Sequence, residues 1–176
     1  MKKLHLLPVG PVDTQLLEWL GQALYEKFRV PAEILMPALD PAFALHAERQ
    51  QYHSSEILGS MQRYIHKDTW RLLGITQLDL YIPILTFVFG EAQMGGKSGV
   101  VSYHRLEQNF YGLPSDLDLL ANRLLVESVH ELGHTLHLTH CHDYQCAMAP
   151  AHAVGWIDIK DSGFCEDCLA RALQAV

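Results

Sequence analysis

The chain has 176 residues, of which 49% are hydrophobic, and it carries a formal net charge of −7 at pH 7. A chain of this length fits one domain, and no apolar run approaches the roughly 20 residues that a membrane-spanning helix needs. The acidic balance argues against a nucleic-acid partner, because such proteins bind the phosphate backbone through a basic patch. We therefore expect one α/β domain that binds neither nucleic acid nor membrane.

The first third of the chain predicts a βαβ unit. Its elements are a strand at 3–9, an amphipathic helix at 13–28 and a short strand at 32–35. Residues 39–52, which contain Pro41 and several alanines, are ambiguous. Apolar side chains at helical spacing then predict a helix over 54–71.

The middle of the chain has β-type composition. The predicted strands are 77–82, 87–89 and 100–103, with glycine-rich turn chemistry at 94–97 between the last two. We therefore expect a mixed sheet before the long helix that follows.

A long helix is predicted from about residue 116 to residue 136. Ser115 is the expected N-cap, because the acidic Asp118 follows it three residues later. Leucines and valines supply an apolar face, and no Pro or Gly interrupts it before Gly133. A glycine inside a helix costs about 1 kcal/mol relative to Ala, so we expect a close packing contact or room for substrate at Gly133.

His130, Glu131 and His134 form an HExxH motif on the last turns of this helix. Residues four apart project from one helix face, so His130 and His134 can reach the same ion. Glu131 lies roughly 100° around the helix from His130, where it reaches a water on that ion rather than the ion itself. Zinc lowers the pKa of a bound water to about 7, so a carboxylate can act as its general base. The motif predicts hydrolysis of an amide.

The third metal ligand has three interpretations: His137, His140, or a glutamate distant in the sequence. Helical spacing alone favours His137, which follows His134 by three residues. A chain that turns after residue 137 would instead bring His140 to the metal from another direction. The residues by themselves leave these alternatives open.

All four cysteines follow the helix, at Cys141, Cys146, Cys165 and Cys168. They could hold a structural zinc, form two disulfides, or include a redox CxxC pair. Residues 1–8 are no convincing signal peptide, which favours a cytoplasmic location and counts against disulfides. Cys165 precedes a predicted helix at 169–176, but a redox pair leaves the first two cysteines unexplained. Zinc accounts for all four, and it would supply folding energy to a segment with few large apolar residues.

These motifs together resemble the metzincin peptidases, whose signature is HExxHxxGxxH, and specifically the archaemetzincins. In that family the third His is followed at once by a Cys, then by CxM and CxxC, as at His140-Cys141, 146–148 and 165–168. The resemblance covers about residues 113–170. It implies two zinc ions per chain: a catalytic ion held by His130, His134 and His140, with Glu131 as general base and Met148 as the Met-turn residue, and a structural ion held by Cys141, Cys146, Cys165 and Cys168.

The chain departs from the family pattern in two places. His137 stands where the signature has Gly, and the loop before the CxxC differs in length by one residue. Gly permits a positive φ where the helix ends, and His enters that region more often than most residues. We expect His137 to adopt a positive φ under mild strain; otherwise the helix would continue and His137 could touch the metal.

The resemblance implies a single compact metzincin-like α/β domain with a mixed twisted sheet. Its parts would be an N-terminal βα part (1–112), the active-site helix with the third ligand (113–140) and a structural-zinc segment (141–176). A bound peptide would lie antiparallel to an edge strand, for which 91–93 is a candidate, although a plain hairpin loop is an alternative. His142 and His152 are candidates for contacts near the metals.

The predicted function is that of a zinc metallopeptidase, which hydrolyses peptide bonds through a zinc-bound water activated by Glu131. The alternatives are a non-catalytic, zinc-stabilised module that binds peptides or proteins, and a redox protein that uses Cys165 and Cys168. No residue marks the natural substrate, the position of cleavage within it, or the oligomeric state.

Overall fold

The fold is built on a five-stranded mixed sheet, described over residues 1–174 by a computed structural model. The strand order is β2-β1-β5-β8-β7, with bounds β2 Ala32–Ile34, β1 Lys3–Pro8, β5 Thr69–Thr76, β8 Ser98–Ser102 and β7 Gly90–Ala92. Neighbouring strands are parallel except β7, which pairs antiparallel with β8. The predicted mixed sheet is confirmed, and β7 lies at its edge.

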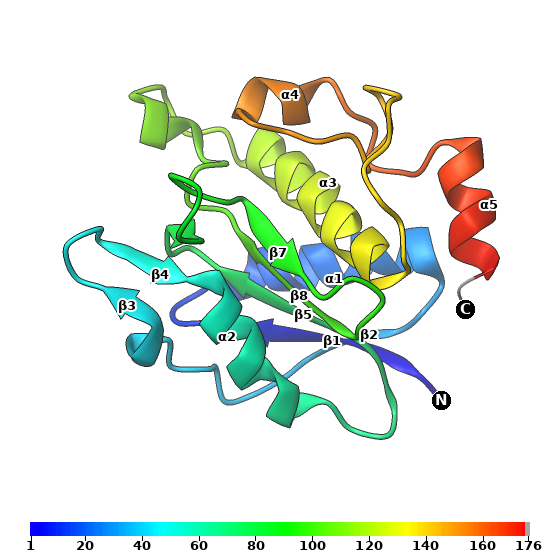
Figure 1. The fold of residues 1–176 in the computed structure, drawn as a ribbon, viewed down its shortest axis with the longest axis horizontal. Coiled ribbons are helices and arrows are strands. Elements are labelled where there is room, and N and C mark those ends of the chain that lie inside the picture. Colours follow the sequence, from blue (N-terminus) through cyan, green and yellow to red (C-terminus); the bar gives the residue numbers. More distant parts are fainter. Residues whose placement is uncertain (175–176) are drawn as a thin grey trace.

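Helices cover both faces of this sheet (Figure 1). Helix α1 (Thr14–Phe28) and helix α3 (Leu117–Thr135) pack together on one face, and α2 (Ser54–Met61) contacts β7 and β8 from the other. Successive strand residues alternate between the two faces. In β5, Leu73 joins the core under α1 and α3, while Leu72 joins the core under α2. The strands therefore carry buried apolar residues on both sides, which is typical of parallel sheets covered by helices.

Short elements fill the connections. A three-stranded sheet contains β3 (Leu45–His46), β4 (Gln51–His53) and β6 (Leu80–Tyr81), and three 3-10 helices span Ala42–Ala44, Gln62–Tyr64 and Gln108–Tyr111. The ambiguous residues 39–52 thus contain one 3-10 helix and two short strands. None of the described helices combines the length and hydropathy that a membrane span requires.

The helix predicted over 54–71 is wrong beyond Met61. The chain leaves α2 through a 3-10 turn and enters β5 at Thr69, and β5 is the middle strand of the five-stranded sheet. Residues 72–76 of this strand, for which no element was predicted, are all buried, so they lack the polar alternation that marks a half-exposed strand. A continuous apolar run of this kind looks the same in a buried helix and a buried strand.

Three other boundaries differ from the predictions. The strand expected at 87–89 is instead β7 at Gly90–Ala92, and Val88 makes only an isolated bridge with Leu80. Of the strand expected at 77–82, only β6 forms. The N-cap of α3 is Asp116 rather than Ser115, because the Asp116 carboxylate accepts the Leu119 N–H at 2.9 Å.

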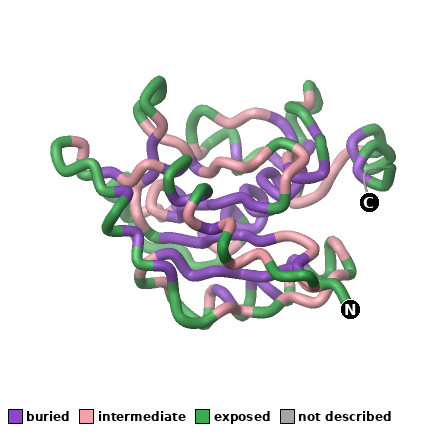
Figure 2. The backbone as a smooth tube through the Cα atoms, turned by 60° about the horizontal axis from the view of Figure 1, so that its bottom comes forward, coloured by how far each residue is buried: buried purple, intermediate pink, exposed green. Residues whose placement is uncertain are grey.

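The chain after α3 contains two short helices and long loops. These helices are α4 (Val154–Asp158) and α5 (Glu166–Gln174). The predicted helix at 169–176 begins three residues earlier, and its last two residues lie outside the described part of the chain. Figure 2 shows buried backbone along the sheet strands, whereas α5 is mostly exposed.

Candidate metal and catalytic site

Three imidazole groups meet beside the C-terminal end of α3. His130, His134 and His140 each offer a ring nitrogen, and these atoms all lie within 4.8 Å of one another. The Nε2 atoms of His130 and His134 are 3.1 Å apart. The ring of His140 approaches from the loop after the helix, with its centroid 5.3 Å from that of His130 and 5.1 Å from that of His134.

Backbone carbonyl groups orient the first two rings. His130 Nδ1 lies 2.7 Å from the carbonyl oxygen of Ala147, and His134 Nδ1 lies 2.8 Å from that of Leu138. A proton on each Nδ1 satisfies these carbonyls and leaves both Nε2 atoms as bare acceptors. Metal-bound histidines commonly use their second nitrogen in this way.

The electrostatic setting favours neutral rings at all three positions. Burial is the largest cause that lowers the pKa of His130, and it also lowers the pKa of His134 and of His140. A neutral imidazole keeps a lone pair for a metal. Three neutral nitrogen donors around one point fit a zinc ion that keeps a fourth position open.

Glu131 lies next to this point with its side chain buried. Burial raises its pKa well above the usual range, and the nearby carboxylates of Glu127 and Glu91 raise it further. The carboxylate lies against Gly90 of β7, where a Cβ atom would come within 2.6 Å of Glu131 Oε1. Gly90 is therefore a site residue that sequence reasoning missed. The predicted strand ended at residue 89, so Gly90 was not recognised as a strand glycine, which often marks a close approach.

The chain turns after α3 at His137, as predicted. His137 has a φ of +64°, and its ring lies away from the three-histidine group, packed on Gly95 of the β7–β8 turn. A Cβ atom at Gly95 would come within 2.0 Å of His137 Cε1, and the Gly95 N–H donates to the His134 carbonyl at 2.9 Å. The structure thus brings His140, not His137, to the other two histidines.

Met148 is fully buried and packs against α3. A Cβ atom at Gly133 would come within 2.3 Å of Met148 Sδ. The close packing contact expected at Gly133 is therefore present, and its partner is the proposed Met-turn residue. Any larger side chain at Gly133 would push Met148 away from the helix.

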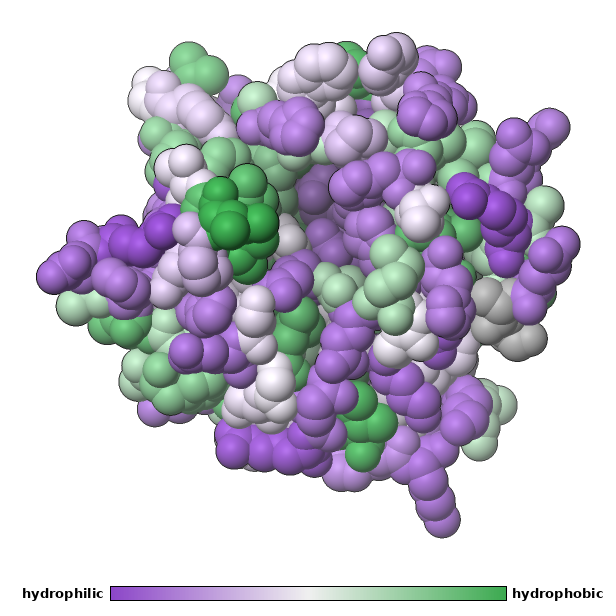
Figure 3. Space-filling view, in the orientation of Figure 1, coloured by the Kyte–Doolittle hydropathy of each residue, from purple (hydrophilic) through white to green (hydrophobic). Residues whose placement is uncertain are grey.

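A cleft of about 490 Å³ lies above the histidines. Strand β7 and the loop before it form one wall, and residues 150–152 contribute to the other. Figure 3 shows the hollow in the face that bears β7 and α3, with hydrophilic residues gathered in it. Glu91 and Ala92 belong to the edge strand, whereas Gln93 begins the turn. Of the two other candidate histidines, His152 lines this cleft and His142 lies beside the cysteines.

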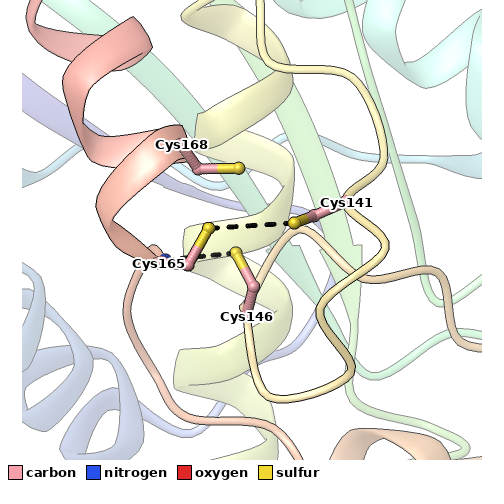
Figure 4. Close-up of side chains that lie close together, drawn as sticks. All are labelled: Cys141, Cys146, Cys165 and Cys168. Carbon is pink, nitrogen blue, oxygen red and sulfur yellow. Dashed lines mark hydrogen bonds between the residues drawn. The ribbon is translucent and has the colours of Figure 1, made fainter.

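The four cysteines form a second group (Figure 4). Cys141 and Cys146 lie in the loop after α3, Cys165 lies directly before α5, and Cys168 lies in its first turn. The four sulfur atoms are within 4.8 Å of one another, and none is in a disulfide. Burial raises the pKa of Cys168 to about 12 and also raises the pKa of Cys146. A raised pKa disfavours the deprotonated thiolate unless a cation lies nearby. A zinc ion bound by all four sulfur atoms would be that cation.

Backbone and side-chain donors surround these sulfur atoms. The Cys165 N–H donates to Cys146 Sγ at 3.3 Å, and the Asp143 N–H donates to Cys141 Sγ at 3.4 Å. The guanidinium of Arg171 donates to Cys168 Sγ at 3.2 Å. Such donors stabilise negative charge on sulfur, so the donor set fits a four-cysteine zinc site.

Comparison with known proteins gives consistent matches along almost the whole chain. Residues 18–174 match the family model described as peptidase family M54. The archaemetzincin of Methanocaldococcus jannaschii is 38% identical over 96% of this chain and 92% of that protein. The crystal structure of the Archaeoglobus fulgidus archaemetzincin, complexed with malonate, has a TM-score of 0.83 at 34% identity and covers 96% of this chain and 99% of that chain. A zinc-dependent peptidase from Methanocorpusculum labreanum has a TM-score of 0.88 at 26% identity, with 96% of this chain and 99% of that chain covered.

Proposed function

Because the chain belongs to peptidase family M54, the archaemetzincins, and is a zinc metallopeptidase acting on peptides or proteins, we propose specific roles for the residues of its cleft. His130, His134 and His140 hold the catalytic zinc, and Glu131 is the general base. The observation that carries this proposal is the meeting of three imidazoles beside one buried carboxylate at the base of an open cleft.

A zinc ion at the three histidines would lower the pKa of an attacking water and polarise the scissile carbonyl. Glu131 accepts the proton of that water and passes it to the leaving amine. Burial and the neighbouring carboxylates of Glu127 and Glu91 raise the pKa of Glu131, which strengthens it as a proton acceptor. Gly90 leaves room for the Glu131 carboxylate at the wall of the cleft.

The substrate would bind along β7. This strand has a paired side toward β8, and its other side borders the cleft. An extended peptide that adds to it antiparallel would gain main-chain hydrogen bonds and cross the cleft above the histidines. Glu91 is held at this wall by Ser55, whose hydroxyl donates to the Glu91 carboxylate at 2.8 Å.

A second zinc would be held by Cys141, Cys146, Cys165 and Cys168, which makes two ions per chain. It would fix the backbone of Cys141, the direct neighbour of His140, and so connect the fold of the last segment (141–176) to the active-site helix and third ligand (113–140). The N-terminal βα part (1–112) would supply the sheet. Four free thiols grouped around one point favour a reducing compartment, so we propose a cytoplasmic location.

Wild-type protein and a Glu131→Ala variant, both loaded with zinc, test the catalytic proposal. Each is incubated with a diverse peptide mixture, and new termini are identified by mass spectrometry. Cuts made only by the wild type are expected, and their positions distinguish internal cleavage from trimming of ends. Equal cutting by both proteins would overturn the role of Glu131, and bound zinc without any cuts would favour a module that only binds peptides.

A further inference from the structure

Two ion pairs connect α3 to the segment around α4, and they have opposite polarity. Arg123 of α3 pairs with Asp158 at 2.7 Å. One helical turn later, Glu127 of α3 pairs with Lys160, with 3.6 Å between Lys160 Nζ and Glu127 Oε1. Helix α3 and the segment around α4 are therefore joined twice, once with the positive charge on α3 and once with the negative charge on α3.

The Arg123 pair has the properties of a structural ion pair. Nε and Nη2 of Arg123 each donate to one oxygen of Asp158 at 2.7 Å, and Nη1 donates to the Leu106 carbonyl at 2.7 Å. Such a bidentate pair combines geometry and charge. The Asp158 side chain is 34% exposed, so water completes its solvation.

The Glu127 pair lacks these properties. Its side chains are almost fully buried, with 1% of Lys160 and 5% of Glu127 exposed. Among the described residues, Glu127 Oε1 is one of two buried side-chain nitrogen or oxygen atoms without a hydrogen-bond partner. Burying two charges that are incompletely satisfied is weak evidence for stability. An unsatisfied buried group in a native fold requires another explanation, and function is one.

The position of this pair supplies that explanation. Glu127 lies one turn before Glu131 and lines the same cleft. Lys160 Nζ lies 3.5 Å from the Ala147 carbonyl oxygen, which is the acceptor for His130 Nδ1 at 2.7 Å. The ammonium group therefore reaches the backbone oxygen that sets the direction of the His130 ring, immediately before Met148.

We infer that Lys160, held by Glu127, is a positioning residue of the catalytic site, whose ammonium group fixes the Ala147 carbonyl that orients His130 toward the metal. This inference rests on the proposed role of His130 as a zinc ligand. Lys160 acts through the carbonyl and touches neither substrate nor metal. The Arg123 pair joins the same elements without this contact, so it is the matched control.

The test compares two charge-neutral double variants, Glu127→Gln/Lys160→Met and the control Arg123→Met/Asp158→Asn. The first readout is the zinc affinity of the histidine site, from competition with a chelating dye. The second is the visible spectrum of the cobalt-loaded protein, in which thiolate charge-transfer bands report the cysteine site separately. Rates of peptide cleavage, resolved into kcat and KM, are the third.

We expect the Glu127/Lys160 variant to bind zinc at the histidines about 10–100-fold more weakly, with an altered cobalt spectrum and a reduced kcat at little-changed KM. The control should melt at a lower temperature and keep all three properties. Unchanged affinity and spectrum in a folded Glu127/Lys160 variant would overturn the inference, as would equal losses in the control. If wild type shows no Glu131-dependent cleavage, the proposed function fails, while affinity and spectrum still decide the role of Lys160.

A Lys160→Ala variant provides the second route, because it can be rescued chemically. Propylamine, protonated near neutral pH, should restore zinc affinity, whereas propanol, which has the same shape and no charge, should not. Equal restoration by both would mean that Lys160 only fills space, and this would overturn the inference.

Discussion

The part of the molecule built on the five-stranded sheet, here called the sheet half, and the segment after α3 are stabilised by different means. The sheet has a core on each face, built from leucine, isoleucine and valine of its strands and helices. The core of the last segment is small, and the described residues beyond 140 contribute four buried members to it: Cys146, Met148, Cys168 and Ala172. Two of these four are cysteines whose sulfur atoms face the proposed zinc.

This difference explains how an active site can depend on a segment with little core of its own. Burial of a large aliphatic side chain contributes about 1.5–3 kcal/mol, and the sheet half has many such residues. The last segment has few, so its fold would rely on metal binding. Since Cys141 follows His140 directly, the same metal would hold the third ligand of the catalytic site in place.

Metal removal gives the largest expected effect. A chelator should unfold residues 141–174 while β1, β5 and β8 stay folded, because structural zinc contributes on the order of 10 kcal/mol in small domains. Hydrogen–deuterium exchange read by mass spectrometry would show lost protection in the first group of peptides only. Uniform loss of protection over the whole chain would show that the two halves are not stabilised by different means.

Two variants separate the two metals in this experiment. Cys168→Ser removes a buried thiol of the cysteine group and should reproduce the exchange pattern of the chelated protein. His140→Ala removes an exposed member of the histidine group and should leave protection of 141–174 intact. The reverse pattern would assign the stabilising metal to the histidines.

A substitution in the sheet should have the opposite pattern and a smaller effect. Leu73 in the middle strand is fully buried, so Leu73→Ala should lower the free energy of unfolding by about 2–5 kcal/mol. Denaturant titration measures this loss, and zinc content measured on the same folded protein should not change. If zinc were lost before the sheet unfolded, the two halves would be coupled more tightly than their separate cores indicate.

The sequence predicted the chemistry of the site better than the order of the sheet, and the reason is the range of the interactions. His130 and His134 are one helical turn apart, and each cysteine pair is close in sequence, so local spacing brings their donors together. The predicted helix ran into the first three residues of strand β5, and residues 72–76 were assigned to no element because a fully buried strand carries no periodic signal. Its identity depends on contacts with β1 and β8, which are distant along the chain.

Two residues of the site could not be recognised from spacing at all. Gly90 matters because the Glu131 carboxylate packs on it from another element. Lys160 matters because its ammonium group reaches the Ala147 carbonyl. In both cases the residue type was visible, but its partner is set by the tertiary fold.

The smallest predicted effect concerns one of the contacts between the two halves, that of His137 with Gly95. His137→Gly relieves a positive φ that costs a non-glycine residue about 1 kcal/mol. It also gives the unfolded chain more conformational freedom and removes the ring from Gly95, and both of these changes are destabilising. These terms oppose each other, so the free energy of unfolding should change by less than about 1 kcal/mol. His137→Ala keeps the strain and loses the ring, and it should be the less stable of the two.

A substitution of Gly95, the contact partner of His137, completes a double-mutant cycle with His137→Gly. Gly95→Ala places a side chain at a φ of +67° and against the His137 ring, so it should destabilise by about 2 kcal/mol. When His137 is already Gly, only the backbone cost remains, and the double variant should be more stable than the two single effects predict, by about 1 kcal/mol. If the two single effects add strictly in denaturant titrations, the His137 ring moves away from the new side chain at no energetic cost. The Gly95–His134 hydrogen bond alone would then fasten the β7–β8 turn to the end of α3.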